Sequence, residues 1–111
     1  MRLENMPEVT VNWSRESPAL IEGARGHFLV RARRSGEIQQ RIVDYAPGYV
    51  ADHWCLKGHV LYVLSGELTI EHEDGSSPVA LAADVSWSVG DGERPAHRVR
   101  SEAGARVFIV D

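Results

Sequence analysis

Short turns recur along this 111-residue chain at intervals that leave little room for long helices. Most of them are eight to twelve residues apart, and they are Ser35-Gly36, Pro47-Gly48, Lys57-Gly58, Ser65-Gly66, Asp74-Gly75, Asp91-Gly92 and Ala103-Gly104. Turn signals at this spacing are typical of all-β sandwiches and barrels. The sequence therefore predicts an all-β protein, and the length fits one domain.

Between the turns, apolar and polar residues alternate with a period of two, as in strands with one buried face. The alternation is clear over residues 9–13, 28–33, 68–71 and 85–89. Residues 107–110 are apolar throughout, which predicts a central strand covered on both faces. The one helical candidate is residues 18–22, at most a turn. We expect residues 1–25 to form an N-terminal arm over the barrel or over a second subunit, and residues 26–111 to form the barrel.

The net charge and the cysteine content limit which binding partners and which cellular compartment are expected. Twelve Lys and Arg against sixteen Asp and Glu give a net charge of −4, which disfavours binding to a phosphate backbone. The run Arg31, Arg33 and Arg34 is expected to be a solvated outer strand face. No stretch without charged residues exceeds nine residues, whereas a membrane-spanning helix needs about twenty. The single cysteine forms no intrachain disulfide. We expect a soluble, cytoplasmic protein without a nucleic-acid or membrane partner.

Four residues of metal-binding types form a pattern. His53 and Cys55 are separated by one residue, so on a strand both side chains point to the same face. Lys57-Gly58 permits a reversal, after which His59 opens the next strand. Opposed side chains on an antiparallel pair lie about 4.5–5.5 Å apart at Cβ, close enough to share an ion. His97 begins a later alternating run and is the fourth candidate.

This spacing resembles the first signature of the cupin superfamily, in which six residues separate the third ligand, here His59, from a glycine, here Gly66. The later segment with Asp84, Pro95 and His97 resembles the second signature. Cupins are small β-barrels that commonly hold one divalent metal. The resemblance implies a single-domain cupin barrel whose ligand set is His53, Cys55, His59 and His97. Cys55 stands where cupins have a second histidine, and His59 where they have a glutamate.

The block of residues 46–59 is similar to the core signature of a smaller cupin-fold group, named for an Asp-His-Cys-Trp (DHCW) motif. The letters of that motif appear here as Asp52-His53-Trp54-Cys55. The ends of the chain, Trp13-Ser14 and Phe108-Ile109-Val110-Asp111, are similar too. The resemblance covers nearly the whole chain and implies the fold rather than a reaction, because the group has no established reaction.

Cys55 leaves the nature of the metal site open. As a thiolate ligand, Cys55 favours zinc or copper over manganese. With Cys55 unligated, His53, His59 and His97 form a three-histidine site that resembles the thiol-oxidising iron cupins and suits Fe(II). Zinc, iron, copper and nickel are not distinguished, and a barrel without metal is a third alternative. His27 and His72 match no ligand position and are expected at the surface.

The remaining expectations concern the cavity and the assembly. Tyr49 shares the inward parity, and Trp87 is a core residue that can wall a pocket, so both are candidate contacts for a small molecule. Trp54 has the outward parity and needs cover, either from the arm or from a homodimer. Three functions follow: a small metalloenzyme, a ligand-binding cupin without turnover, and a dimeric scaffold.

Overall fold

The computed structural model describes residues 3–111, and nearly all regular structure in them is β-strand. The elements are η1 (Trp13–Arg15), β1 (Ala19–Glu22), β2 (His27–Ser35), β3 (Ile38–Tyr45), β4 (Tyr49–Val50), β5 (His59–His72), β6 (Val79–Ala82), β7 (Ser86–Val89), β8 (His97–Ser101) and β9 (Ala105–Val110). The all-β prediction is confirmed. No helix among residues 3–111 is long and apolar enough to cross a membrane.

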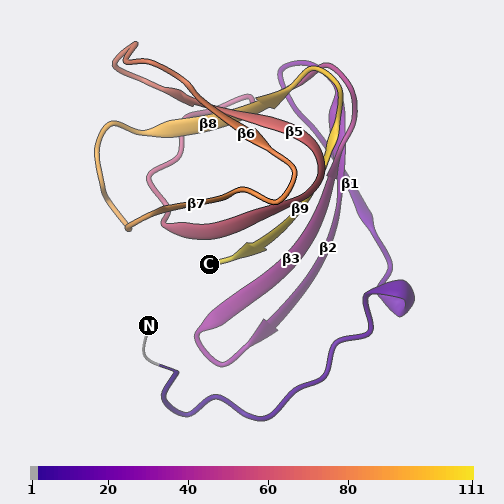
Figure 1. Cartoon of the computed structure of the whole chain (residues 1–111). Coiled ribbons are helices and arrows are strands. Elements are labelled where there is room, and N and C mark those ends of the chain that lie inside the picture. The colour runs from indigo at the N-terminus through magenta and orange to yellow at the C-terminus, as the bar shows by residue number, and fades with distance from the viewer. Residues whose placement is uncertain (1–2) are drawn as a thin grey trace.

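The strands form one curled antiparallel sheet in the order β1-β2-β3-β9-β5-β8-β4, with β6 and β7 also paired to β5. In Figure 1 the sheet folds over on itself, so that β6 and β8 lie above β7 and β9. The apolar strand predicted at residues 107–110 is confirmed as central, because β9 pairs with β3 on one side and β5 on the other.

Strand β5 changes its inward-facing parity partway along. Leu61 and Val63 are buried in its first half and Leu68 and Ile70 in its second, so the buried positions pass from odd to even numbers. An irregular register between Val63 and Ser65 inserts the extra residue that a β-bulge requires. Gly66 follows with φ +79°, and a Cβ there would lie 2.1 Å from the carbonyl oxygen of Gly104, so only glycine fits.

The N-terminal residues differ from the sequence prediction in two places. Residues 9–12 form no strand, and η1 follows them, because the side chain of Asn12 accepts from the Ser14 amide and caps a single turn. Within the helical candidate, residues 18–22, the structure forms the edge strand β1 over residues 19–22 instead. Trp13 packs edge-on against Phe108, with 6.5 Å between ring centroids, so this segment covers the outer face of β9.

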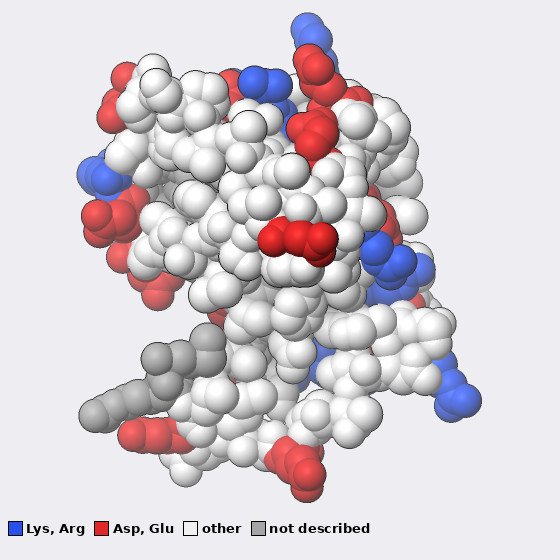
Figure 2. Space-filling model, viewed as in Figure 1, with Lys and Arg blue, Asp and Glu red and all other residues white. Residues whose placement is uncertain are grey.

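Charged side chains on the outer face of β2 are neutralised locally. Arg31 pairs with Asp44 and Arg33 with Glu16, as a solvated strand face requires. Figure 2 shows basic and acidic side chains interspersed over the visible face among larger areas of other residues. The basic run of the sequence is therefore part of a mixed surface on this strand.

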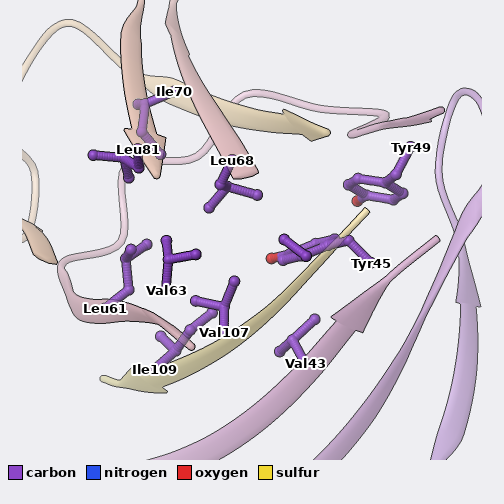
Figure 3. Packing of buried hydrophobic residues seen from close by; sticks show 11 residues of the cluster. Val43, Tyr45, Tyr49, Leu61, Val63, Leu68, Ile70, Leu81, Val107 and Ile109 are labelled. Atoms are coloured by element: carbon purple, nitrogen blue, oxygen red, sulfur yellow. The ribbon is translucent and has the colours of Figure 1, made fainter. Parts of the chain in front are cut away.

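The hydrophobic core lies between the two layers of the curled sheet (Figure 3). We call the part of the barrel that this core fills the closed end. Its side chains with no exposed surface are Val43, Val63, Leu68, Ile70 and Val107, from β3, β5 and β9. Each such side chain contributes about 1.5–3 kcal/mol by leaving water. Towards the other end the same inward positions carry polar residues, and there the candidate site lies.

Candidate metal centre

Three of the four predicted ligands come together. One ligand atom from each of Cys55, His59 and His97 lies within 4.8 Å of the others, and the Sγ of Cys55 is 4.0 Å from the Nε2 of His59. His59 is the first residue of β5 and His97 the first of β8. Cys55 is held beside His97 by two backbone hydrogen bonds, of 2.8 and 3.0 Å. We call these three residues the Cys/His/His group.

His53 does not join this group. The strand expected to carry His53 and Cys55 on one face is absent, because β4 ends at Val50 and residues 51–54 form no strand. The side chain of His53 is 79% exposed, and its Nδ1 lies 2.6 Å from Oδ1 of Asp52. The parity argument therefore failed for His53, since it requires an unbroken strand.

His97 is buried without any hydrogen bond. It is 3% exposed, and neither ring nitrogen has a hydrogen-bond partner among residues 3–111. The ring instead contacts two aromatic neighbours edge-on, with centroids 5.0 Å from Trp87 and 5.2 Å from His59. Burial, followed by repulsion from His59 and His72, lowers the pKa of His97 to about 4. At neutral pH the ring is uncharged and keeps a free lone pair, as a metal ligand must.

His59 is oriented by a buried carboxylate that the sequence analysis missed. Oδ2 of Asp111 accepts from Nδ1 of His59 at 3.0 Å and from Nη2 of Arg41 at 2.7 Å. The Asp111 side chain is 1% exposed, and Nζ of Lys57 is 3.8 Å from its Oδ1. Burial lowers the pKa of His59, against the raising effect of Asp111. With the proton on Nδ1, the Nε2 lone pair faces Cys55. A carboxylate behind a histidine is the usual second contact of a metal-binding imidazole.

Cys55 offers sulfur to the same space. Its Sγ accepts the backbone N–H of Lys57 at 3.3 Å. In a tetrahedral zinc site with Zn–N of about 2.1 Å and Zn–S of about 2.3 Å, the ligand atoms are about 3.5 Å apart. The observed 4.0 Å between sulfur and the His59 nitrogen is a small adjustment from that separation.

A cavity of about 270 Å³ adjoins the group. Both residues predicted to contact a small molecule, Tyr49 and Trp87, line it. Its wall is mostly apolar or aromatic, with Phe28, Tyr45, Leu61, Val99 and Ile109 beside those two. A wider, more open groove of about 650 Å³ shares Lys57, His59 and Asp111 with the cavity, so the polar end of the cavity borders on this groove.

Unpartnered buried polar atoms are concentrated at this cavity. Within residues 3–111, five buried side-chain polar atoms lack a hydrogen bond, and four of them belong to cavity-lining residues. These four are Nε of Arg41, Nδ1 and Nε2 of His97, and Oδ1 of Asp111. Because native proteins rarely leave such atoms unsatisfied, the concentration indicates a site that a bound species completes.

Comparison with known proteins shows the fold. No family model matches the chain, and neither does any curated protein. A predicted oxalate decarboxylase from Thermotoga maritima superposes with a TM-score of 0.75 at 17% identity, over 92% of this chain and 96% of the other. The polyketide cyclase RemF from Streptomyces resistomycificus gives 0.75 at 14% identity, over 94% and 78%. An RmlC-like cupin from Shewanella frigidimarina gives 0.70 at 19% identity, over 95% and 90%. The chain therefore has the cupin fold.

Proposed function

We propose that this protein is a metal-binding cupin that holds one divalent transition metal on Cys55, His59 and His97 and acts on a small molecule in the adjoining cavity. The observation that carries the proposal is His97, a buried imidazole with both nitrogens unpartnered, directly beside a thiol and a second imidazole. The donor set fits the group that the fold implies, because one sulfur and two imidazoles are ligands that zinc and copper prefer.

Three protein ligands leave coordination positions free, as in catalytic zinc sites. A metal bound there would supply Lewis acidity towards an oxygen of the small molecule or towards water. The surrounding residues have separate tasks. Asp111 and Arg41 fix the orientation of His59, while Trp87 and the apolar wall line the cavity beside the group. His53 also lines the cavity, but its side chain is 79% exposed and lies outside the group, so it supplies a ligand only if the segment around it rearranges.

Elemental analysis of untagged protein tests the metal directly. We expect about one equivalent in the parent, and loss of the metal in Cys55→Ser and His97→Ala. His27→Ala is the matched control, since His27 is exposed and outside the group. His53→Ala should retain the metal if three ligands suffice. Substoichiometric metal in the parent, unchanged in both ligand variants, refutes the proposal.

The second candidate is a cupin that binds its small molecule without turnover. It is favoured by the absence, among the described cavity-lining residues, of a carboxylate free to act as a base, since Asp111 is engaged by Arg41 and His59. The enzyme proposal draws support from two structural neighbours described as a predicted oxalate decarboxylase and a polyketide cyclase. Neither description transfers a substrate to this chain.

Three finer assignments complete the proposal. Membership of the DHCW group rests on the run Asp52–Cys55, and a cytoplasmic location on the single free cysteine.

A homodimer rests on Trp54, which is half-buried with one ring face covered by the Arg98 guanidinium, 4.3 Å from the ring centroid. Exposed Leu20 and Ile21 on the edge strand β1 add apolar surface. Sedimentation of Trp54→Ser against the parent tests the dimer, and two monomers of equal mass contradict it.

A further inference from the structure

We propose that the small molecule bound in the cavity is an organic monocarboxylate with an apolar body, whose carboxylate is held at the polar end by Lys57 and Arg41. The inference deepens the proposed function and rests on it, because the same cavity holds the Cys/His/His group. It is built from three observations: an excess of positive charge, hydrogen-bond donors without an acceptor, and a small apolar chamber.

The charge at the polar end is unbalanced. Lys57 and Arg41 both converge on Asp111, at 3.8 and 2.7 Å, so two cations surround one anion. His59 is the third partner of that carboxylate, through its Nδ1 at 3.0 Å. Arg98 also lines the cavity, and Glu71, which lies outside the lining, is shared between Arg98 and Arg100. Positive charge is therefore in excess beside the chamber, which favours an anion.

Hydrogen-bond donors without an acceptor line the cavity, beside one unpartnered acceptor, Oδ1 of Asp111, which Nζ of Lys57 approaches to 3.8 Å. Nε of Arg41 is buried without a partner, and the side chain comes from the same inward face of β3 as Val43 and Tyr45. The hydroxyls of Tyr45 and Tyr49 make no hydrogen bond within the described part of the chain, and both point into the barrel interior in Figure 3. Burial raises the pKa of both tyrosines, so both hydroxyls stay protonated and donate. A molecule that satisfies these groups must bring oxygen acceptors.

The chamber itself limits size and polarity. At about 270 Å³ it lies below the range of about 300–1,000 Å³ for pockets that enclose drug-sized ligands. Its apolar wall and aromatic rings suit an apolar body with a single charged end. The groove that shares Lys57 and Asp111 with the cavity gives such a molecule a path to the polar end. A nucleotide or another large polyanion does not match this volume.

Benzoate is the probe, and neutral benzamide is its isosteric control. Both are titrated calorimetrically into EDTA-treated and zinc-loaded protein, with NMR shifts of Tyr49 and Trp87 locating the site. Lys57 is the only lysine of the chain, and Lys57→Gln removes its charge without touching the Cys/His/His group. Arg15→Gln is the matched control, because Arg15 is exposed on η1. Phenyl phosphate tests whether the head group must be a carboxylate.

We expect benzoate to bind in the cavity, benzamide to bind at least tenfold more weakly, and Lys57→Gln to weaken benzoate binding by about fivefold while Arg15→Gln changes nothing. Equal binding of benzoate and benzamide overturns the inference, and so does tighter binding of phenyl phosphate. The absence of benzoate binding at about 10 mM, a concentration at which weak ligands are detected, overturns it as well. Zinc content is measured separately. Zinc without benzoate refutes this inference alone, whereas benzoate without zinc refutes the metal site alone.

Discussion

The two ends of the barrel are built from the same strands but differ in the polarity of their inward-facing side chains. At the closed end, the inward side chains of β3, β5 and β9 are apolar and have no exposed surface. At the cavity end, the same strands carry Arg41, His59 and, directly after β9, Asp111, and four buried polar atoms lack partners there. The closed end therefore supplies most of the stability of the fold. The cavity end instead keeps buried polar atoms without hydrogen-bond partners, an arrangement suited to binding.

The largest effect is expected from truncating the closed end. Leu68→Ala removes a side chain with no exposed surface and should lower the free energy of unfolding by about 2–5 kcal/mol, measured by urea denaturation. Zinc stoichiometry of the folded protein should stay the same. A loss of zinc in this variant would break the comparison, because it would couple the two ends.

The next effect is a pH dependence that belongs to the cavity end. The pKa of His97 is about 4 in the folded protein, against 6.5 ordinarily. As the pH falls below 6.5, the His97 imidazole becomes protonated in the unfolded chain, whereas in the folded protein it stays neutral until about pH 4. Metal-free protein should therefore lose about 2–3 kcal/mol between pH 6.5 and 4, measured by urea denaturation. His97→Gln should lose most of this pH dependence, with the lowered pKa of His59 accounting for the remainder, and His27→Gln should retain it in full. A parent protein with flat stability over this window contradicts the prediction.

Asp111→Asn tests how the carboxylate that accepts from Nδ1 of His59 contributes to metal binding. The amide accepts more weakly from Nδ1 and carries no charge, so zinc affinity should fall about 10–100-fold in chelator competition. The nitrogen chemical shifts of His59 report the tautomer independently of the metal. Asp74→Asn, at the exposed turn after β5, is the control. Unchanged zinc affinity together with an unchanged tautomer would show that Asp111 serves only the fold.

The smallest expected effect is a gain. His97→Leu replaces a buried, unpartnered imidazole by an apolar side chain, and metal-free protein should become about 1–2 kcal/mol more stable while zinc binding is lost. Thermal unfolding with and without EDTA measures both. Destabilisation as large as that of Leu68→Ala would mean that His97 belongs to the core rather than to a site.

Sequence patterns were sufficient for the fold where strands are long and paired. The alternation at residues 28–33 and 68–71 corresponds to β2 and β5, and the apolar run at 107–110 to β9. The alternation at 9–13 misled because a strand needs a neighbour, and these residues have none in the sheet. Local pattern carries no information about pairing partners, which tertiary packing decides.

The site was predictable in part for the same reason. His59 and His97 start strands, so their parity held, whereas His53 lies in an irregular segment where parity has no meaning. Asp111 was missed, although it continues the inward positions of Val107 and Ile109. Its contact with Arg41 spans 70 residues and cannot be read from spacing. A charged residue at the inward parity of a buried strand is the signal that could have identified it.

The position of β9 has a consequence for biosynthesis. It follows every other strand in the described chain, yet it lies between β3 and β5, which do not pair directly with each other. Until β9 has left the ribosome, the two halves of the sheet cannot join, and Asp111 cannot reach Arg41 and His59. A nascent chain therefore exposes Cys55 before its cavity exists, and its thiol is open to oxidation or stray metals during synthesis.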